Sequence, residues 1–239
     1  MATTQLVLTS MAVVAMLTTT MACSTPLSLR GARVMEQGEL EVIASPQVTV
    51  DVLSVADGHE PPPGLLFAPE LSARFGIADR VDLQLRVDQS ILPEVSAGYQ
   101  LVGDPTRDDD FALTVTGGLK PSWLLSREVF LSAPIQLLAE VPLNDDVALT
   151  GGVRVVAGAG LDNNSELVVA VSPGVTAGLR WRVGPFVFHP ELGVATALAS
   201  GDYRVQFITP TLVPRPLLAA SFGLNVGGVF DFREPTVER

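Results

Sequence analysis

The chain has 239 residues, a formal net charge of −11 and a mean hydropathy of +0.38. The acidic balance argues against binding to nucleic acid and against attraction to anionic lipid surfaces. No stretch after residue 22 reaches the roughly 18 apolar residues of a membrane-spanning helix. High hydropathy without such a helix leaves a soluble domain with a large apolar core or a transmembrane β-barrel.

The first residues have the pattern of an export signal. Residues 1–22 carry no charged side chain, and their apolar run is too short to span a membrane as a helix. The following segment Thr20-Met21-Ala22-Cys23 resembles the lipobox of bacterial lipoproteins, in which the cysteine becomes the lipidated first residue. Cys23 is the only cysteine, so it has no internal disulfide partner. We predict a signal peptide over 1–22 and a lipidated start with a periplasmic linker over 23–38; the alternative is an ordinary signal cut after Ala22.

Apolar and polar residues alternate with period two along the rest of the chain. Between Val81 and Asp88 every odd position is apolar and every even position is polar or charged, which no helix face produces. Most of the predicted strands reach the roughly 9–11 residues that a tilted strand needs to cross a bilayer. The sequence therefore predicts an all-β fold, an antiparallel up-and-down transmembrane β-barrel over residues 39–232 with a tail over 233–239. About ten strands are expected, over residues 39–54, 66–76, 81–90, 92–102, 111–119, 129–141, 147–159, 166–182, 185–199 and 217–232.

The predicted connections differ between the two ends of the barrel. One end has mostly short connections, such as 77–80 and 183–184, whereas the other includes the long ones at 56–65 and 200–216. Short periplasmic turns and long external loops are the rule for outer-membrane barrels, so both ends of the barrel chain are predicted to be periplasmic. An aromatic girdle is expected on the apolar face at this end, formed by Phe75, Tyr99, Phe111, Trp181, Phe186, Phe188, Phe230 and Phe232.

The last predicted strand ends on two aromatic residues that are two positions apart. Period two places Phe230 and Phe232 on one face and Asn225 and Gly227 on the other. The spacing polar-x-Gly-x-x-aromatic-x-aromatic resembles the C-terminal β-signal of bacterial outer-membrane β-barrels. The resemblance implies a small porin-like barrel in the outer membrane, with membrane lipid and the barrel assembly machinery as partners.

The polar face of the predicted strands combines long charged residues with many glycines, as the crowded lumen of a narrow barrel requires. A lumen network is expected from Arg74, Asp82, Arg86, Glu94, Arg180, Arg182, His189 and Glu191. Within this network we expect Arg74 to pair with Asp82 and Arg86 with Glu94. We also expect Arg180 or Arg182 to pair with Glu191. Such pairs would block the lumen and not leave a wide pore.

Two histidines are the candidates for catalysis. His59 lies beside acidic residues in a predicted outer loop, and His189 shares a strand face with Glu191. Each has a simpler interpretation, a solvated loop and a lumen hydrogen-bond network. No calcium or phosphate-binding motif is present in the sequence, and no cofactor is expected.

The sequence therefore predicts a non-enzymatic outer-membrane barrel and lipoprotein that serves as a narrow channel, a small-solute or lipid-handling barrel, or a structural anchor. The alternative is a lipid-anchored soluble β-barrel that binds an apolar ligand in its lumen. A third hypothesis is an outer-membrane hydrolase that uses His189 or His59. The sequence does not indicate the oligomeric state.

Overall fold

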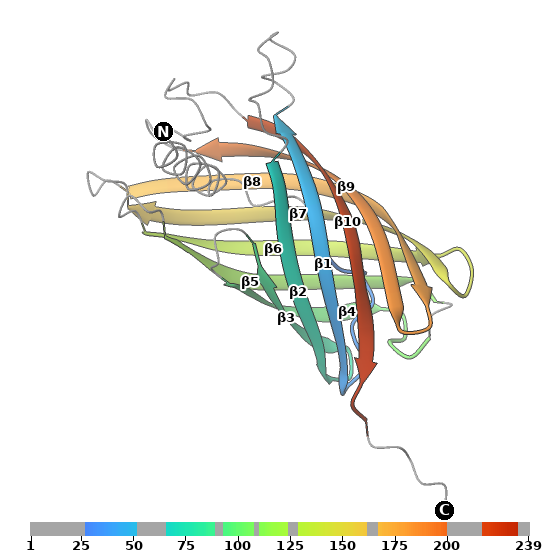
Figure 1. Cartoon of the computed structure of the whole chain (residues 1–239). Coiled ribbons are helices and arrows are strands. Elements are labelled where there is room, and N and C mark those ends of the chain that lie inside the picture. Colours follow the sequence, from blue (N-terminus) through green and yellow to red (C-terminus); the bar gives the residue numbers. More distant parts are fainter. Residues whose placement is uncertain are drawn as a thin grey trace, which may run out of the picture.

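A computed structural model gives the fold and describes residues 27–51, 66–88, 93–107, 110–123, 129–161, 167–199 and 217–233. Ten antiparallel strands close into one barrel, in which each strand pairs with its neighbours along the chain and the last pairs with the first (Figure 1). The predicted up-and-down barrel of about ten strands is thus confirmed. The strands are β1 (Glu39–Asp51), β2 (Leu66–Ala78), β3 (Val81–Val87), β4 (Pro93–Val102), β5 (Ala112–Trp123), β6 (Val129–Pro142), β7 (Val147–Leu161), β8 (Leu167–Val183), β9 (Phe186–Ala199) and β10 (Leu217–Asp231).

Most strand ends lie within a few residues of the predicted ones. The largest extension is in β5, which continues past the predicted end at residue 119 to Trp123. These added residues pair with β6, where Lys120 lies opposite Ser132. Alternation in one strand does not show how far its neighbour extends, so the partner strand sets this boundary. Among the described residues, no helix is long and apolar enough to cross a membrane.

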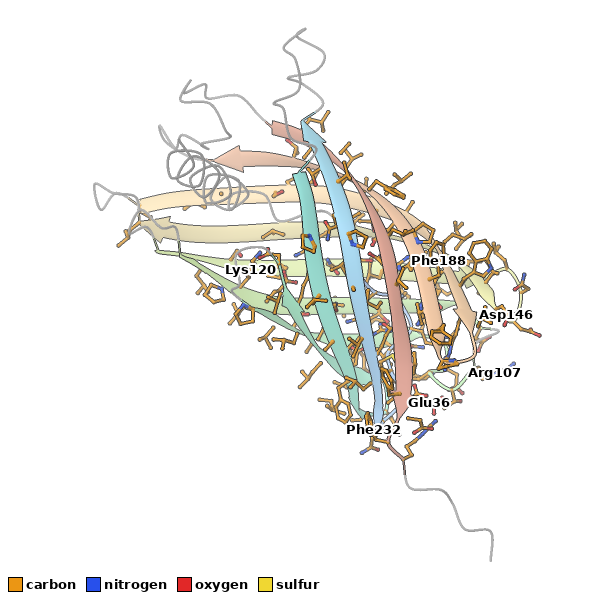
Figure 2. The ribbon with its side chains drawn as sticks, in the orientation of Figure 1. Glu36, Arg107, Lys120, Asp146, Phe188 and Phe232 are labelled. Carbon is orange, nitrogen blue, oxygen red and sulfur yellow. The ribbon has the colours of Figure 1, made fainter. Side chains whose placement is uncertain are left out.

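The barrel wall is apolar on the outside and polar on the inside. In β3 the side chains of Leu83 and Leu85 are 42% and 46% exposed, whereas Asp82 is fully buried. The same alternation occurs on all ten strands, and buried polar residues outnumber buried apolar ones among the described residues. Figure 2 shows the outward side chains around the ribbon. A soluble β-barrel has the opposite arrangement, with an apolar interior and a polar exterior.

The eight aromatic residues of the expected girdle are all exposed on the outer face. Trp181 and Phe188 lie on neighbouring strands with their ring centroids 6.1 Å apart. Figure 2 shows Phe188 and Phe232 toward the same end of the barrel, and Lys120 lies away from that end. The aromatic residues therefore mark the end at which β1 begins and β10 ends.

The barrel closes where β10 pairs with β1, from Glu39 opposite Asp231 to Asp51 opposite Ala219. The two backbones approach closely at Gly227, because a Cβ atom built there would lie 2.1 Å from the carbonyl oxygen of Val42. Only glycine fits this point of the seam without a shift of the backbone. The strand that resembles a β-signal is thus the strand that closes the barrel.

The segment before β1 corrects the sequence prediction of a linker over residues 23–38. Its described part, residues 27–38, enters the barrel from the mouth at residues 36–38 and is named the plug segment below. Gly38 donates to the carbonyl of Gly76 (3.1 Å) at the end where β1 begins, and Leu27 lies against Gly223, about halfway along β10. Residues 27–35 are all buried. The segment has no period-two pattern, so its sequence does not indicate a position in the lumen.

Glycines of the wall make room for the plug segment. A Cβ atom at Gly76 would lie 1.9 Å from the carbonyl oxygen of Glu36, and one at Gly98 would lie 2.8 Å from Nη2 of Arg30. A ten-stranded barrel is wider than the eight-stranded barrels whose interiors side chains just fill, so an additional segment can occupy the remaining space. The small residues expected in the lumen therefore accommodate a peptide backbone as well as long side chains.

Candidate functional site in the barrel lumen

Charged side chains of the wall bind the backbone of the plug segment at its N-terminal half. Glu191 accepts hydrogen bonds from the amides of Ser28 (2.8 Å) and Leu29 (3.2 Å). The carbonyl of Leu27 accepts from Nη1 of Arg86 (3.0 Å) and Nη1 of Arg154 (3.2 Å). A buried backbone without a strand partner must find such groups, because an unpaired buried amide or carbonyl is costly.

The C-terminal half of the plug segment is held in the same way. Glu140 accepts from the amide of Ala32 (3.0 Å), and Gln100 accepts from the amide of Val34 (3.0 Å). Arg74 donates through Nη1 to the carbonyls of Gly31 (3.1 Å) and Arg33 (3.0 Å). Side chains from β2, β4 and β6 therefore bind main-chain atoms of the segment and hold it as an ordered part of the interior.

The plug segment also contributes two arginines to the interior. Nη2 of Arg30 lies 2.9 Å from Oδ2 of Asp82, and both side chains are fully buried. Arg33 donates to the carbonyls of Asp104 (2.5 Å) and Asp110 (2.7 Å) in the connection between β4 and β5, and its Nε lies 3.9 Å from Oε1 of Glu140. The segment is thus fixed by side-chain charge as well as by its backbone.

The lumen residues predicted from the sequence are mostly in the interior, with different partners from those expected. Nε of Arg74 lies 3.7 Å from Asp82, as expected for a pair, but its closer contact is with Glu41 at 2.8 Å. Arg86 and Glu94 are opposite each other in the β3–β4 register. Their hydrogen bonds are nevertheless to other residues.

Long side chains in a narrow lumen reach beyond the adjacent strand. Arg86 donates through Nε to Glu70 (2.7 Å) on β2, and Glu94 accepts from Nη2 of Arg154 (2.9 Å) on β7. The closest partners of Arg86 and Glu94 are therefore Glu70 and Arg154, and not each other as expected. The register places residues on the same face, but contacts across the lumen decide their partners.

The expected pairing of Glu191 with an arginine is also wrong. Nη2 of Arg180 lies 2.6 Å from Glu41, and its Nη1 lies 3.7 Å from Glu140. The oxygens of Glu191 instead bind the plug segment, and one also accepts from Nδ2 of Asn225 (3.3 Å). The plug segment occupies the space between these groups, which is why strand positions alone did not predict their contacts.

Four charged residues of the interior were not predicted to be there, namely Arg30, Arg33, Glu41 and Glu70. The alternation of Glu39 and Glu41 with Leu40 and Val42 could have placed Glu41 on the lumen face. The sequence gives a weaker indication that Arg30 and Arg33 are in the interior. They are two cations in a mostly apolar stretch that has no acidic residue before Glu36.

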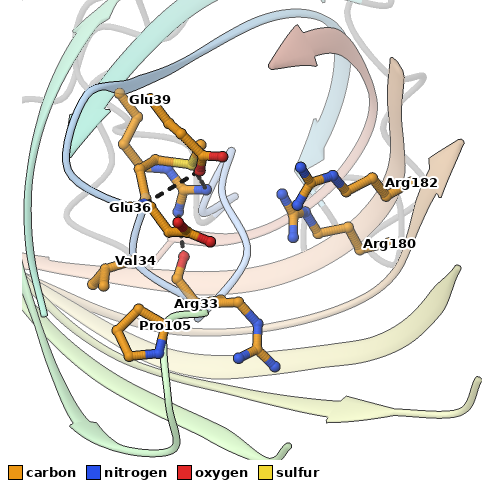
Figure 3. A pocket seen from close by; sticks show the side chains of 9 residues that line it. Arg33, Val34, Glu36, Glu39, Pro105, Arg180 and Arg182 are labelled. Carbon is orange, nitrogen blue, oxygen red and sulfur yellow. Dashed lines mark hydrogen bonds between the residues drawn. The ribbon is translucent and has the colours of Figure 1, made fainter. Parts of the chain in front are cut away.

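The mouth of the lumen, at the end where β1 begins, contains a small pocket lined by charges of both signs. Figure 3 shows Arg180 and Arg182 on one side of it and Arg33, Glu36 and Glu39 on the other. Arg182, expected in the lumen, is half-buried at this mouth. Beyond β10, Arg233 binds Asp231 (2.7 Å) and Glu36. The hydrogen bond with Asp231 is the largest cause that raises the pKa of Arg233, and the hydrogen bond with Glu36 raises it further.

His189 lies in the interior beside a hydroxyl group. Its side chain is fully buried, and its Nε2 lies 2.8 Å from Oγ1 of Thr150. Glu191, on the same face of β9, binds the amides of Ser28 and Leu29 in the plug segment. In the described part of the chain, no group of three or more His, Cys, Asp or Glu residues could hold a metal ion. His59 and Cys23 lie outside the described residues.

The four residues of the β-signal resemblance occupy two faces of β10. Asn225 is fully buried against Glu191, and Gly227 lies at the seam with β1. Phe230 and Phe232 are 51% and 66% exposed on the outer face. Both aromatic side chains are thus accessible from outside the barrel wall.

No family model matches the chain, and no curated protein sequence matches it significantly. Solved structures of similar shape include Ail, the attachment invasion locus protein of Yersinia pestis, with 12% identity and a TM-score of 0.38 over 82% of this chain and 100% of Ail. Neisserial surface protein A has 14% identity and a TM-score of 0.33 over 81% and 96%. OprG from Pseudomonas aeruginosa has 12% identity and a TM-score of 0.34 over 83% and 99%. At these values the likeness carries no argument about function.

Proposed function

We propose that this chain is a non-enzymatic β-barrel of the bacterial outer membrane, a narrow channel for small polar solutes whose lumen is closed by the plug segment in the described state. The observation that carries the proposal is the apolar outer face around a charged interior. Large apolar side chains are exposed on every strand, among them Leu71, Val95, Ile135, Val175 and Leu192, each at least 51% exposed. Contact of this apolar surface with water would have a high free-energy cost, whereas contact with lipid would not.

The same arrangement of faces argues against the soluble alternative. A lipid-anchored barrel that binds an apolar ligand needs an apolar lumen, but the interior here contains ion pairs such as Arg30 with Asp82 and Arg154 with Glu94. Lipid handling through the lumen is disfavoured for the same reason, since acyl chains would have to displace bound charges. A polar lumen is suited to ions and small polar molecules.

The burial of residues 27–35 supports a closed state. Their backbone is bound by side chains from opposite walls, for example Glu191 on β9 and Arg86 on β3. The hydrolase hypothesis receives no support from His189, whose Nε2 is bound to Thr150 in the interior. The occupied lumen fits a gated or structural role better than catalysis.

Lipidation of Cys23 and the periplasmic position of the barrel ends remain part of this proposal. Cys23 lies four residues before Leu27, outside the described residues. Comparison of wild type and Cys23→Ser by metabolic labelling with palmitate tests lipidation. Incorporation into wild type alone supports the anchor, and equal absence from both proteins would reject it.

The membrane barrel itself is tested by fractionation of Cys23→Ser. We expect this variant to stay in the outer-membrane fraction after carbonate washing and to migrate faster on gels without boiling, as folded membrane barrels do. Release of the unanchored variant by carbonate would support the soluble alternative. In planar bilayers we expect wild type to show no large, stable conductance, and such a conductance would contradict the closed lumen.

A further inference from the structure

The barrel wall has more buried acids than buried arginines, whereas the plug segment contributes only arginines to the interior. Glu39, which lies at the mouth, is not counted here. Six buried acids are on the strands: Glu41, Glu70, Asp82, Glu94, Glu140 and Glu191. Only four buried arginines are on the strands: Arg74, Arg86, Arg154 and Arg180. The wall alone thus has a buried net charge of −2 among the described residues, and Arg30 and Arg33 bring it to zero. Lys120 and Asp88, which are less buried, form an ion pair and cancel.

The wall arginines keep acidic partners that do not depend on the plug segment. Arg74 and Arg180 both bind Glu41, Arg86 binds Glu70, and Arg154 binds Glu94. These contacts join one strand to another, so they remain when the segment moves. The excess negative charge of the wall is therefore concentrated on the other acids.

Three wall acids have the plug segment as a main partner. Asp82 binds the guanidinium of Arg30 and the amide of Met35 (3.3 Å). Glu140 binds the amide of Ala32, and Glu191 binds two further amides of the segment. Without the segment these carboxylates would lose their closest donors and keep only longer wall contacts, those of Asp82 with Arg74 (3.7 Å), Glu140 with Arg180 (3.7 Å) and Glu191 with Asn225 (3.3 Å). A buried charge that is poorly compensated is strongly unfavourable. A cation from solution is the ligand that would restore the balance.

We propose that Arg30 and Arg33 are tethered cations, and that the wall around Asp82, Glu140 and Glu191 is a binding and permeation path for small monovalent cations when the plug segment leaves it. This inference rests on the proposed function as a closed membrane barrel and names the solute class of that same lumen. An excess of acids inside a narrow wall of low dielectric constant raises the local concentration of cations and excludes anions.

The test is a planar-bilayer recording of the full chain with Arg30→Gln and Arg33→Gln combined. Glutamine keeps much of the side-chain length but removes both positive charges. We expect open events that wild type lacks, with a reversal potential in a KCl gradient that moves toward that of potassium. Methylguanidinium, a soluble mimic of the arginine side chain, should block this current more strongly than tetramethylammonium.

The matched control is the combination of Arg80→Gln and Arg107→Gln, which removes the same charge from exposed turns. It should stay closed like wild type. Folding of each variant is checked first by heat-modifiable migration. If the double lumen variant does not fold, Arg33→Gln alone is recorded, because it keeps the pair of Arg30 with Asp82.

A folded lumen variant that stays closed, or that conducts without preference or for anions, would overturn the cation path while leaving the membrane barrel intact. Conductance of wild type, or its failure to insert into lipid, would instead overturn the proposed closed barrel. The two failures are therefore distinguishable in one set of recordings.

Discussion

Gly76 lies where the plug segment meets the barrel wall. A Cβ atom there would lie 1.9 Å from the carbonyl oxygen of Glu36, a backbone atom that cannot turn away as a side chain can. We expect Gly76→Ala to displace the C-terminal part of the plug segment and to destabilise the barrel by about 1–3 kcal/mol, as overpacking does. Urea unfolding in lipid vesicles measures the loss, and protease cleavage after Arg33 reports the displacement.

Gly117→Ala is the matched control for this substitution. Gly117 is on β5 with an exposed position, and a Cβ atom there would meet nothing within 4 Å. We expect a change within about 0.5 kcal/mol, as for most surface substitutions. Equal effects of the two alanines would mean that Gly76 does not make room for the plug segment.

At the residue scale the sequence predicted faces but not partners. Period two was sufficient to place Arg86 and Glu94 on the lumen face, because the two faces of a strand follow from backbone geometry. It could not predict that Arg86 binds Glu70 and that Glu94 binds Arg154. These contacts depend on the barrel radius and on the plug segment, and neither is a property of a single strand.

At the scale of elements, the seam of β1 and β10 depends on Gly227. The built Cβ atom would lie 2.1 Å from the carbonyl oxygen of Val42 and 2.8 Å from Cγ1 of Ile43. We expect Gly227→Ala to separate the two strands locally and to lower the urea midpoint of the folded barrel. The neighbouring Gly228→Ala should be tolerated, because its nearest contact would be at 3.4 Å. A seam that tolerates both would contradict this close approach.

The outer face of β10 is the part that we propose the assembly machinery recognises. Phe230→Ala should lower the amount of folded barrel in cells, while the purified variant refolds in detergent as wild type does. Phe222→Ala is the control, since Phe222 is exposed on the same strand but outside the motif. Equal yields of folded barrel in cells from both variants would argue against recognition of Phe230.

The strand series could be predicted from the sequence, whereas the plug segment could not. Ten alternating segments each show which side chains share a face, so their number and approximate ends follow from local pattern. Residues 27–38 lack that pattern and precede the first strand, which made an external linker the simplest expectation. The structure places them inside because wall side chains such as Glu140 and Arg74 bind their backbone.

At the scale of the whole molecule, the outer face should be sensitive to charge in a way that depends on depth. Val153 is near the middle of β7 and is 50% exposed, and Val183 ends β8 and is 65% exposed. In a bilayer, Val153→Arg should cost about 2–4 kcal/mol and Val183→Arg about 0–1 kcal/mol, because the penalty is largest at the midplane. Urea unfolding in lipid vesicles measures both, and equally small effects would argue against a membrane position.

The sequence by itself determined the all-β class, the approximate strand number and the two faces of each strand, because backbone alternation is local and recurs in each strand. Tertiary structure decided how the lumen is filled, since that depends on the space that remains after the barrel closes. It also decided the ion pairs, because arginine and glutamate side chains reach across the lumen to strands far away in the chain. The plug segment is the clearest case, for its charges and backbone groups are satisfied only inside the closed barrel.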